Sequence, residues 1–198
     1  MRRMIILLVL LAVLCGISSL WADLTALERG LIRLHVVGAT DSYEDQAVKL
    51  RVKDAVAAYL QDKLIAAGTR EDALAILRQE LSNVELIAIR TLAESGFSET
   101  VTVTLGDEEF PRRQYDTFSL PSGVYQSLRI RIGQAQGKNW WCVVFPGLCV
   151  PAVSQDLRDT AVGAGFSEIL TDTITEEYEM RFFLLDCLGQ LQNFFHRE

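Results

Sequence analysis

The sequence predicts an α+β fold: a strand, then three amphipathic helices, then a mostly antiparallel sheet. Residues 31–37 alternate apolar and polar side chains, a pattern typical of a strand. Apolar residues recur at helical spacing over residues 42–96, and alternation returns from residue 101 onward. Because helices and strands are segregated along the chain rather than interleaved, the pattern favours α+β over a parallel α/β sheet.

Each of the three expected helices begins at a hydroxyl side chain followed three residues later by an acid, which is a local signature of a helix start. The three pairs are Ser42 with Asp45, Thr69 with Asp72, and Ser82 with Glu85. Gly68 and Gly96 mark two of the helix ends. The spacing therefore predicts helices over about 42–67, 69–81 and 82–95.

Alternation predicts strands at residues 101–105 and 128–132, and a continuous apolar run predicts a central strand at 140–145. The acidic run at 107–109 is expected in a solvated loop. A last strand is expected at 178–185, followed by a terminal helix.

The N-terminus has the pattern of an export leader. Arg2 and Arg3 precede an uninterrupted apolar run from residue 4 to residue 14, and the mostly apolar stretch reaches Ala22. We expect residues 1–22 to be a signal peptide or an N-terminal anchor, and residues 4–22 are long enough to span a bilayer. Residues 23–198 are expected to form a single exported α+β domain, with 154–198 as an extension that carries no motif.

Composition excludes several function classes. The chain has 198 residues, 26 of them acidic and 19 basic, so it lacks the basic face that nucleic-acid binding requires. Its two histidines, His35 and His196, are too few for a histidine-rich metal cluster, and neither a phosphate-binding loop nor a serine-hydrolase elbow is present. We expect no metal and no cofactor.

Four cysteines leave two interpretations open. Export to an oxidising space favours a disulfide between Cys142 and Cys149, and two buried free thiols are the alternative. Cys187 then has no partner in a chain from which the leader has been removed. A cysteine hydrolase using Cys142 or Cys149 with His35 is the competing enzymatic hypothesis, although an apolar strand disfavours a reactive thiolate at Cys142.

Two blocks of sequence together resemble the stage II sporulation protein R family. The first reads RLHV at residues 33–36 and DSYEDQAVKLRVKDAV at 41–56, where the likeness lies in 41–42, 45–46, 49–50, 52 and 54–56. The second reads GKNWWCVVFP at 137–146, followed by Leu148 and Cys149. Ala39, Gly147 and Val150 depart from the family pattern, which usually has Asn, Pro and an aromatic residue there.

The resemblance implies a signalling protein, not an enzyme, that is made in the forespore and exported into the space between forespore and mother cell. There it would activate a membrane-embedded aspartic protease that matures the mother-cell sigma factor. For such an activator a surface carries the function. The residues expected to contact the partner are Asp41, Ser42, Asp45, Gln46, Lys49, Trp140 and Trp141. Helix capping is the competing role for Asp41, Ser42 and Asp45, and an i,i+4 pair with Asp45 is the competing role for Lys49.

Overall fold

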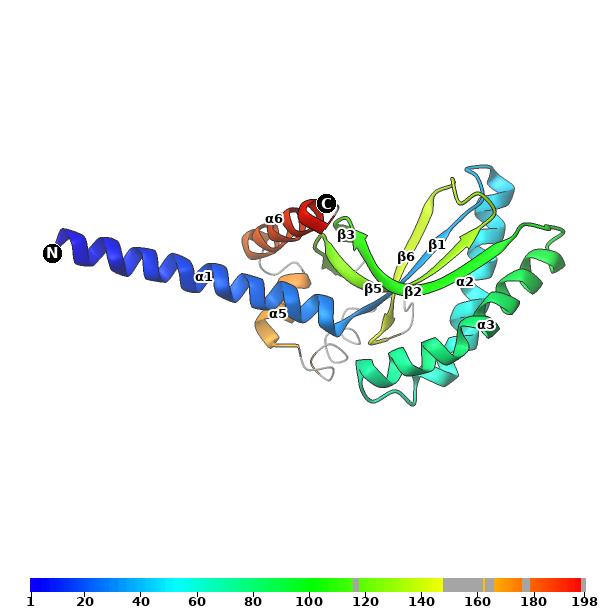
Figure 1. Cartoon of the computed structure of the whole chain (residues 1–198), viewed down its shortest axis with the longest axis horizontal. Helices are drawn as coiled ribbons and strands as arrows, with labels where there is room; N and C mark the ends of the chain where they lie inside the picture. Colours follow the sequence, from blue (N-terminus) through cyan, green and yellow to red (C-terminus); the bar gives the residue numbers. More distant parts are fainter. Residues whose placement is uncertain (116–117, 148–161, 163–165, 176–178, 197–198) are drawn as a thin grey trace. The chain divides into compact units, whose positions relative to one another are not determined.

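The structure, a computed structural model, describes residues 1–115, 118–147, 162, 166–175 and 179–196 (Figure 1). The chain groups into two compact units. One consists of Gly30–Glu108 and Tyr125–Pro151, and the other of Met1–Arg29, Glu109–Val124 and Ala152–Glu198. Residues 23–198, which the sequence predicts to form one exported domain, contribute to both units.

A four-stranded mixed sheet forms the centre of the first unit. Its strands are β1 (Ile32–Val37), β2 (Val101–Phe110), β5 (Gly123–Ile132) and β6 (Asn139–Phe145), in the order β2-β5-β1-β6. β1 runs parallel to β5 and antiparallel to β6. Hydrogen bonds near the two ends of the β2–β5 pair join Gly133 to Thr100 and Gln126 to Asp107, so these strands are antiparallel. The expected α+β class with a mostly antiparallel sheet is confirmed.

Two helices cover one face of this sheet, α2 (Tyr43–Leu64) and α3 (Arg70–Glu94) (Figure 1). Both begin where capping predicts. The Ser42 hydroxyl accepts a hydrogen bond from the Asp45 amide, and Thr69 with Asp72 forms a reciprocal capping box. Apolar side chains from both helices and from alternate strand positions make one core, whose largest fully buried members include Ile32, Leu34, Leu60, Leu77, Leu92 and Leu128.

The prediction of three helices is wrong, because α3 continues without a break through Ser82 and Glu85. No glycine or proline interrupts residues 70–94. Leu77, Val84, Ala88 and Leu92 continue a single buried stripe, so burying this stripe favours one long helix over two short ones. The Ser-x-x-Glu pattern at 82–85 therefore sits on the surface of a helix and does not start one.

The second unit contains α1 (Arg2–Gly30), the short strands β3 (Arg113–Gln114) and β4 (Ser119–Leu120), α5 (Glu168–Ile174) and α6 (Glu179–His196). The predicted strand at 178–185 is wrong for the described part of that segment, which belongs to α6. Phe182, Leu185 and Gly189 recur at helical spacing on its buried side, and a Cβ on Gly189 would lie 1.6 Å from the Ser122 carbonyl oxygen.

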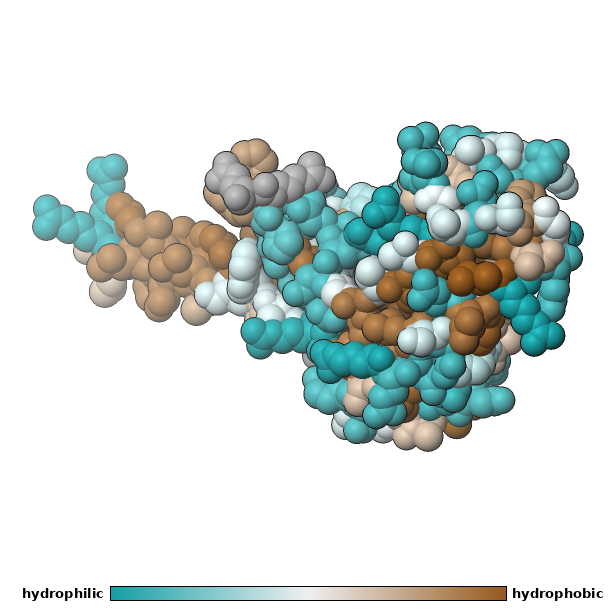
Figure 2. Space-filling view, turned by 45° about the vertical axis from the view of Figure 1, so that its right-hand side comes forward, coloured by the Kyte–Doolittle hydropathy of each residue, from teal (hydrophilic) through white to brown (hydrophobic). Residues whose placement is uncertain are grey.

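Helix α1 is exposed along its apolar part and packed at its C-terminal end. Leu24 and Leu27 are buried, and the Glu28 carboxylate accepts a hydrogen bond of 2.8 Å from the Val124 amide. Among the described residues, α1 is the helix long and apolar enough to cross a membrane. Figure 2 shows its first part as a rod of hydrophobic side chains with hydrophilic ones at the N-terminal tip. This is compatible with a signal peptide or an anchor, as expected, and the helix passes residue 22 without interruption.

Candidate functional site

The loop between β5 and β6 joins the two sequence motifs in space. The Gly137 amide donates to the Gly38 carbonyl oxygen at 3.0 Å, and the Gln136 amide donates to the Ala39 carbonyl oxygen at 3.1 Å. The Lys138 amide donates to an Asp41 carboxylate oxygen at 2.6 Å. The turn before α2 therefore binds the β5–β6 loop, in which Lys138 lies 97 residues after its partner Asp41.

The buried Lys49 stabilises the contact between the turn and the β5–β6 loop. Its ammonium nitrogen donates to the Gln46 side-chain oxygen at 2.6 Å and to the Lys138 carbonyl oxygen at 2.9 Å. Only 4% of Lys49 is exposed. Burial lowers its pKa, while the nearby Asp41 carboxylate opposes that effect. Gln46 in turn donates to the Thr40 carbonyl oxygen at 2.7 Å. Lys49 thus binds the loop directly, and the partly buried Gln46 connects Lys49 to the turn.

Two glycines permit this close approach. A Cβ on Gly137 would lie 2.2 Å from the Thr40 carbonyl oxygen, and a Cβ on Gly38 would lie 2.8 Å from the Gln46 side-chain nitrogen. At Gly137 the clash is with backbone atoms, so the contact there requires glycine, whereas the atom near Gly38 is the end of the flexible Gln46 side chain, which can shift.

The polar residues at the start of α2 differ in their exposure and in their hydrogen-bond partners. Asp41 and Ser42 are exposed, and Asp45, which is partly buried, accepts a hydrogen bond from the Thr40 hydroxyl. The Asp45 carboxylate therefore binds the turn. Lys49 donates to Gln46 and to the Lys138 carbonyl oxygen instead of forming the expected i,i+4 pair with Asp45. Capping by Ser42 is observed, while Asp41 binds the loop rather than the helix end.

Trp140 and Trp141 lie on opposite faces of β6, as adjacent residues of a strand must. Trp140 is 38% exposed, and the Lys53 ammonium lies 5.0 Å from its ring centre in a cation–π contact. Trp141 stacks on the imidazole of His35 with ring centres 5.4 Å apart. Of the two, Trp140 is the more accessible, and it follows the Asp41-bound Lys138 by two residues.

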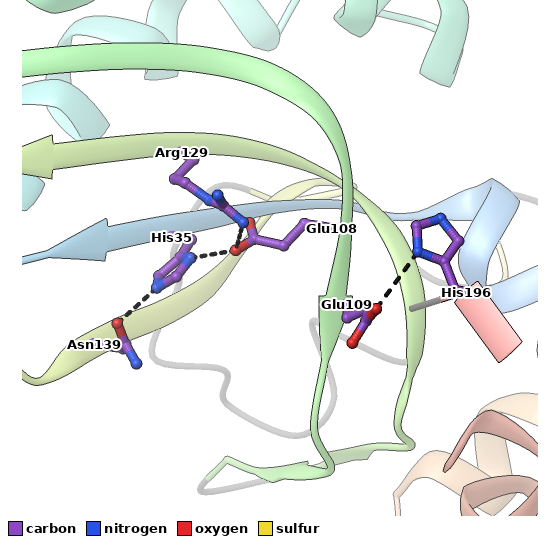
Figure 3. Close-up of polar contacts among 6 residues, drawn as sticks. All are labelled: His35, Glu108, Glu109, Arg129, Asn139 and His196. Carbon is purple, nitrogen blue, oxygen red and sulfur yellow. Dashed lines mark hydrogen bonds and ion pairs between the residues drawn. The ribbon is translucent and has the colours of Figure 1, made fainter. Parts of the chain in front are cut away.

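The face of the sheet opposite the helices carries a polar cluster, which we define as His35, Glu108, Arg129 and Asn139 (Figure 3). His35 Nδ1 lies 2.7 Å from Glu108 Oε1, and His35 Nε2 lies 2.9 Å from Asn139 Oδ1. Arg129 also donates to Glu108 Oε1. Only 9% of the Glu108 side chain is exposed, so this carboxylate lies between the His35 imidazole and the Arg129 guanidinium, largely away from water.

Burial raises the pKa of Glu108, but the hydrogen bonds with His35 and Arg129 outweigh this effect and lower the pKa to about 2. The prediction of a solvated loop at residues 107–109 is wrong, because these residues belong to β2. β2 continues to Phe110, and extending the alternation from residue 101 would have put Glu108 on the same face as Thr102 and Thr104.

The structure does not bring His35 together with Cys142. Cys142 pairs in register with Leu34 and belongs to the core on the helix-covered face, whereas His35 lies on the other face. Cys142 is disulfide-bonded, and Cys15 and Cys187 are free. Cys149 lies outside the described residues, so its predicted pairing with Cys142 stays a prediction. Among the described residues no group of three or more His, Cys, Asp or Glu side chains could hold a metal.

In the second unit, polar contacts join α6 to the end of β2 and to the segment just before β5. His196 Nδ1 lies 3.5 Å from Glu109 Oε1 at the surface (Figure 3). Asp186 accepts hydrogen bonds of 2.8 Å from both the amide and the hydroxyl of Ser122, which fixes α6 to the segment before β5.

Comparison with known proteins agrees with the motif blocks. Residues 28–155 match the family described as stage II sporulation protein R. A curated protein from Bacillus subtilis (strain 168) with that same name is 32% identical over 118 residues, which cover 60% of this chain and 53% of the relative. The chain thus spans about half the length of that relative. No solved structure shows a significant match.

Proposed function

The chain belongs to the stage II sporulation protein R family, and we propose that it is an exported signal that activates a membrane-embedded aspartic protease during sporulation. The protease would then process the mother-cell pro-sigma factor. The family match over residues 28–155 carries the proposal, because it includes both motif blocks and these blocks interlock in the fold.

The N-terminal helix supports an exported location. Its apolar part is exposed and of membrane-spanning length, and two arginines precede it. We place the protein in the space between forespore and mother cell, with residues 4–22 either removed or retained as an anchor. The acidic composition of the chain suits a soluble exported body.

A surface, not an enzymatic centre, would carry activation. Trp140 is the best anchor on that surface, because it is a large aromatic ring, more exposed than Trp141 and held in place by Lys53. Asp41 and Ser42 lie on the same loop-and-turn assembly. Lys49 and Gln46 contribute indirectly by fixing the loop that presents Trp140, and Trp141 does so by packing against His35.

The test is co-expression of the chain with the protease and the pro-sigma factor in a host that does not sporulate. We expect Trp140→Ala to reduce the processed fraction about tenfold or more, as truncation of an aromatic hot spot costs roughly 2 kcal/mol of binding. Ile65→Ala is the matched control, since Ile65 is exposed at the end of α2 and belongs to neither motif. Immunoblotting of the pro-sigma factor measures both.

Two results would separate the proposed surface from the proposed function. Processing that occurs equally without the chain would refute the function. Processing that requires the chain but is unchanged by Trp140→Ala would leave the function standing and show that another surface contacts the partner.

A further inference from the structure

Helix α6 has two apolar sides, and among the described residues only one of them is buried against other parts of the chain. Its inner side includes Phe182, Leu185, Asp186 and Gly189, all buried against the second unit. At 3.6 residues per turn these positions share one side of the helix. The opposite side is exposed, and its residues form what we call the α6 stripe: Met180, Phe183, Leu184, Cys187, Leu191, Phe194 and Phe195.

The α6 stripe is wholly apolar. Phe183 is 59% exposed and Phe194 and Phe195 are each 63% exposed, which is unusual for three aromatic side chains on one short helix. The side chains over residues 180–196 that can carry a charge, which are Arg181, Asp186 and His196, lie off the stripe. A contiguous apolar surface of this kind marks an interaction site.

The stripe is also symmetric about its centre, Cys187. Met180 and Phe194 lie seven residues to either side of it, and Phe183 and Leu191 lie four residues to either side. If two such helices cross antiparallel at Cys187, Met180 of one meets Phe194 of the other and Phe183 meets Leu191, while Leu184 and Phe195 lie opposite positions 190 and 179, at the edges of the stripe. Self-complementarity of this kind is what a two-fold interface between identical chains requires.

We propose that the α6 stripe binds the α6 stripe of a second copy of this chain, with the helices antiparallel and the two-fold axis near Cys187. The two Cys187 thiols would then face each other at the centre of the interface. This inference goes beyond the proposed function and does not depend on it.

Charge favours a second copy over a lipid surface. Helices that lie on membranes are rich in Lys and Arg along their polar side, where they meet anionic headgroups. Over residues 180–196, α6 has a single such residue, Arg181, and this side chain is engaged with Asp23 and with the Ser19 hydroxyl of α1.

The area of the stripe predicts a weak, reversible dimer. From the exposed fractions of its side chains, the stripe offers roughly 600 Å² per copy, which is at the low end for specific interfaces. We therefore expect dissociation in the range of about 1–100 µM rather than a permanent dimer.

Disulfide trapping of the full chain in mild detergent tests the proposal. Cys15→Ser removes the other free thiol, and oxidised glutathione supplies the oxidant: two Cys187 thiols form one disulfide while glutathione disulfide is reduced to two thiols. We expect most of the chain to become a covalent dimer on a non-reducing gel. Adding Phe183→Asp, a change at an exposed position, should reduce trapping at least tenfold.

Moving the thiol tests the antiparallel geometry. In a Cys187→Ser background, Met180→Cys should fail to trap with itself, because two residues seven positions from the axis lie about 21 Å apart along the helices. A disulfide needs Cα atoms within about 7 Å. A mixture of Met180→Cys and Phe194→Cys chains should trap as a heterodimer.

Three outcomes would overturn the proposal. Equal trapping at positions 180 and 187 would indicate a parallel or random encounter, and trapping that survives Phe183→Asp would place the contact elsewhere. Lipid is the occupant if Cys187 in reconstituted vesicles resists a water-soluble maleimide equally at every protein-to-lipid ratio, since protection by a second copy must fall on dilution.

Discussion

Replacing Glu108 with glutamine is expected to lower the free energy of unfolding at pH 7 by about 3 kcal/mol, the cost of removing one partner from a buried, hydrogen-bonded ion pair. The change preserves shape but leaves His35 and Arg129 without the carboxylate that they share. Urea unfolding of the full chain in mild detergent measures the loss. Tryptophan fluorescence is a suitable signal, because Trp141 stacks on His35.

The effect of Glu108→Gln should depend on pH in a defined direction. The pKa of Glu108 is about 2 in the folded chain, below its ordinary value of 4.5. The carboxylate therefore contributes its full stabilisation above about pH 4.5, and the contribution is lost as the pH falls from 4.5 to 2. The difference between wild type and variant should shrink over that range. A difference that stays constant down to pH 2 would contradict the assignment.

Glu94→Gln is the matched control for this experiment. Glu94 pairs with Arg90 at 2.8 Å on the surface of α3, where both side chains are mostly exposed to solvent. Exposed pairs contribute about 0–1 kcal/mol, so this variant should unfold nearly as the wild type does.

Replacing Gly137 with alanine is expected to destabilise the chain by about 2–3 kcal/mol. The added Cβ would lie 2.2 Å from the Thr40 carbonyl oxygen and 2.6 Å from the Thr40 carbonyl carbon. These are backbone atoms and cannot rotate away, so the loop must move off the turn, as in other cases of overpacking. Moving the loop breaks the hydrogen bond from Lys49 to the Lys138 carbonyl oxygen.

Hydrogen exchange locates the damage from Gly137→Ala. The amides of Gln136 and Lys138, which bond Ala39 and Asp41, should exchange faster, while amides of α3 keep their protection. Gly106→Ala is the control, because a Cβ there meets nothing within 4 Å. Equal stability of both variants would show that the close approach at Gly137 is not required.

Local sequence signals succeeded where the interactions that decide the structure are themselves local. The Ser42 and Thr69 caps lie within three residues of their partners, so the starts of α2 and α3 were predictable. The exposed apolar part of α1 follows from composition alone. The motif blocks identified the family, although the roles of their residues could not be assigned from the pattern.

The secondary-structure predictions failed where burial against distant segments of the chain decides which element forms. Ser82 resembles a helix start, yet the core stripe through Leu77 and Val84 keeps α3 continuous. The segment at 178–185 resembles a strand, yet Gly189 and Leu185 need helical spacing to meet the rest of the second unit. A short window of sequence shows neither the continuous buried stripe of α3 nor the contacts that α6 makes with the rest of the second unit.

The sequence by itself determined the export-type N-terminus, the α+β class, two helix starts and the family, because each depends on composition or on residues close in the chain. Tertiary structure alone decided what the motif residues do. Lys49 binds the Lys138 carbonyl oxygen, 89 residues away. His35 binds the Glu108 carboxylate, 73 residues away, and Arg129 binds the same carboxylate. Strand order and register bring such groups together, and a linear pattern does not contain the register of strands that are far apart in the chain.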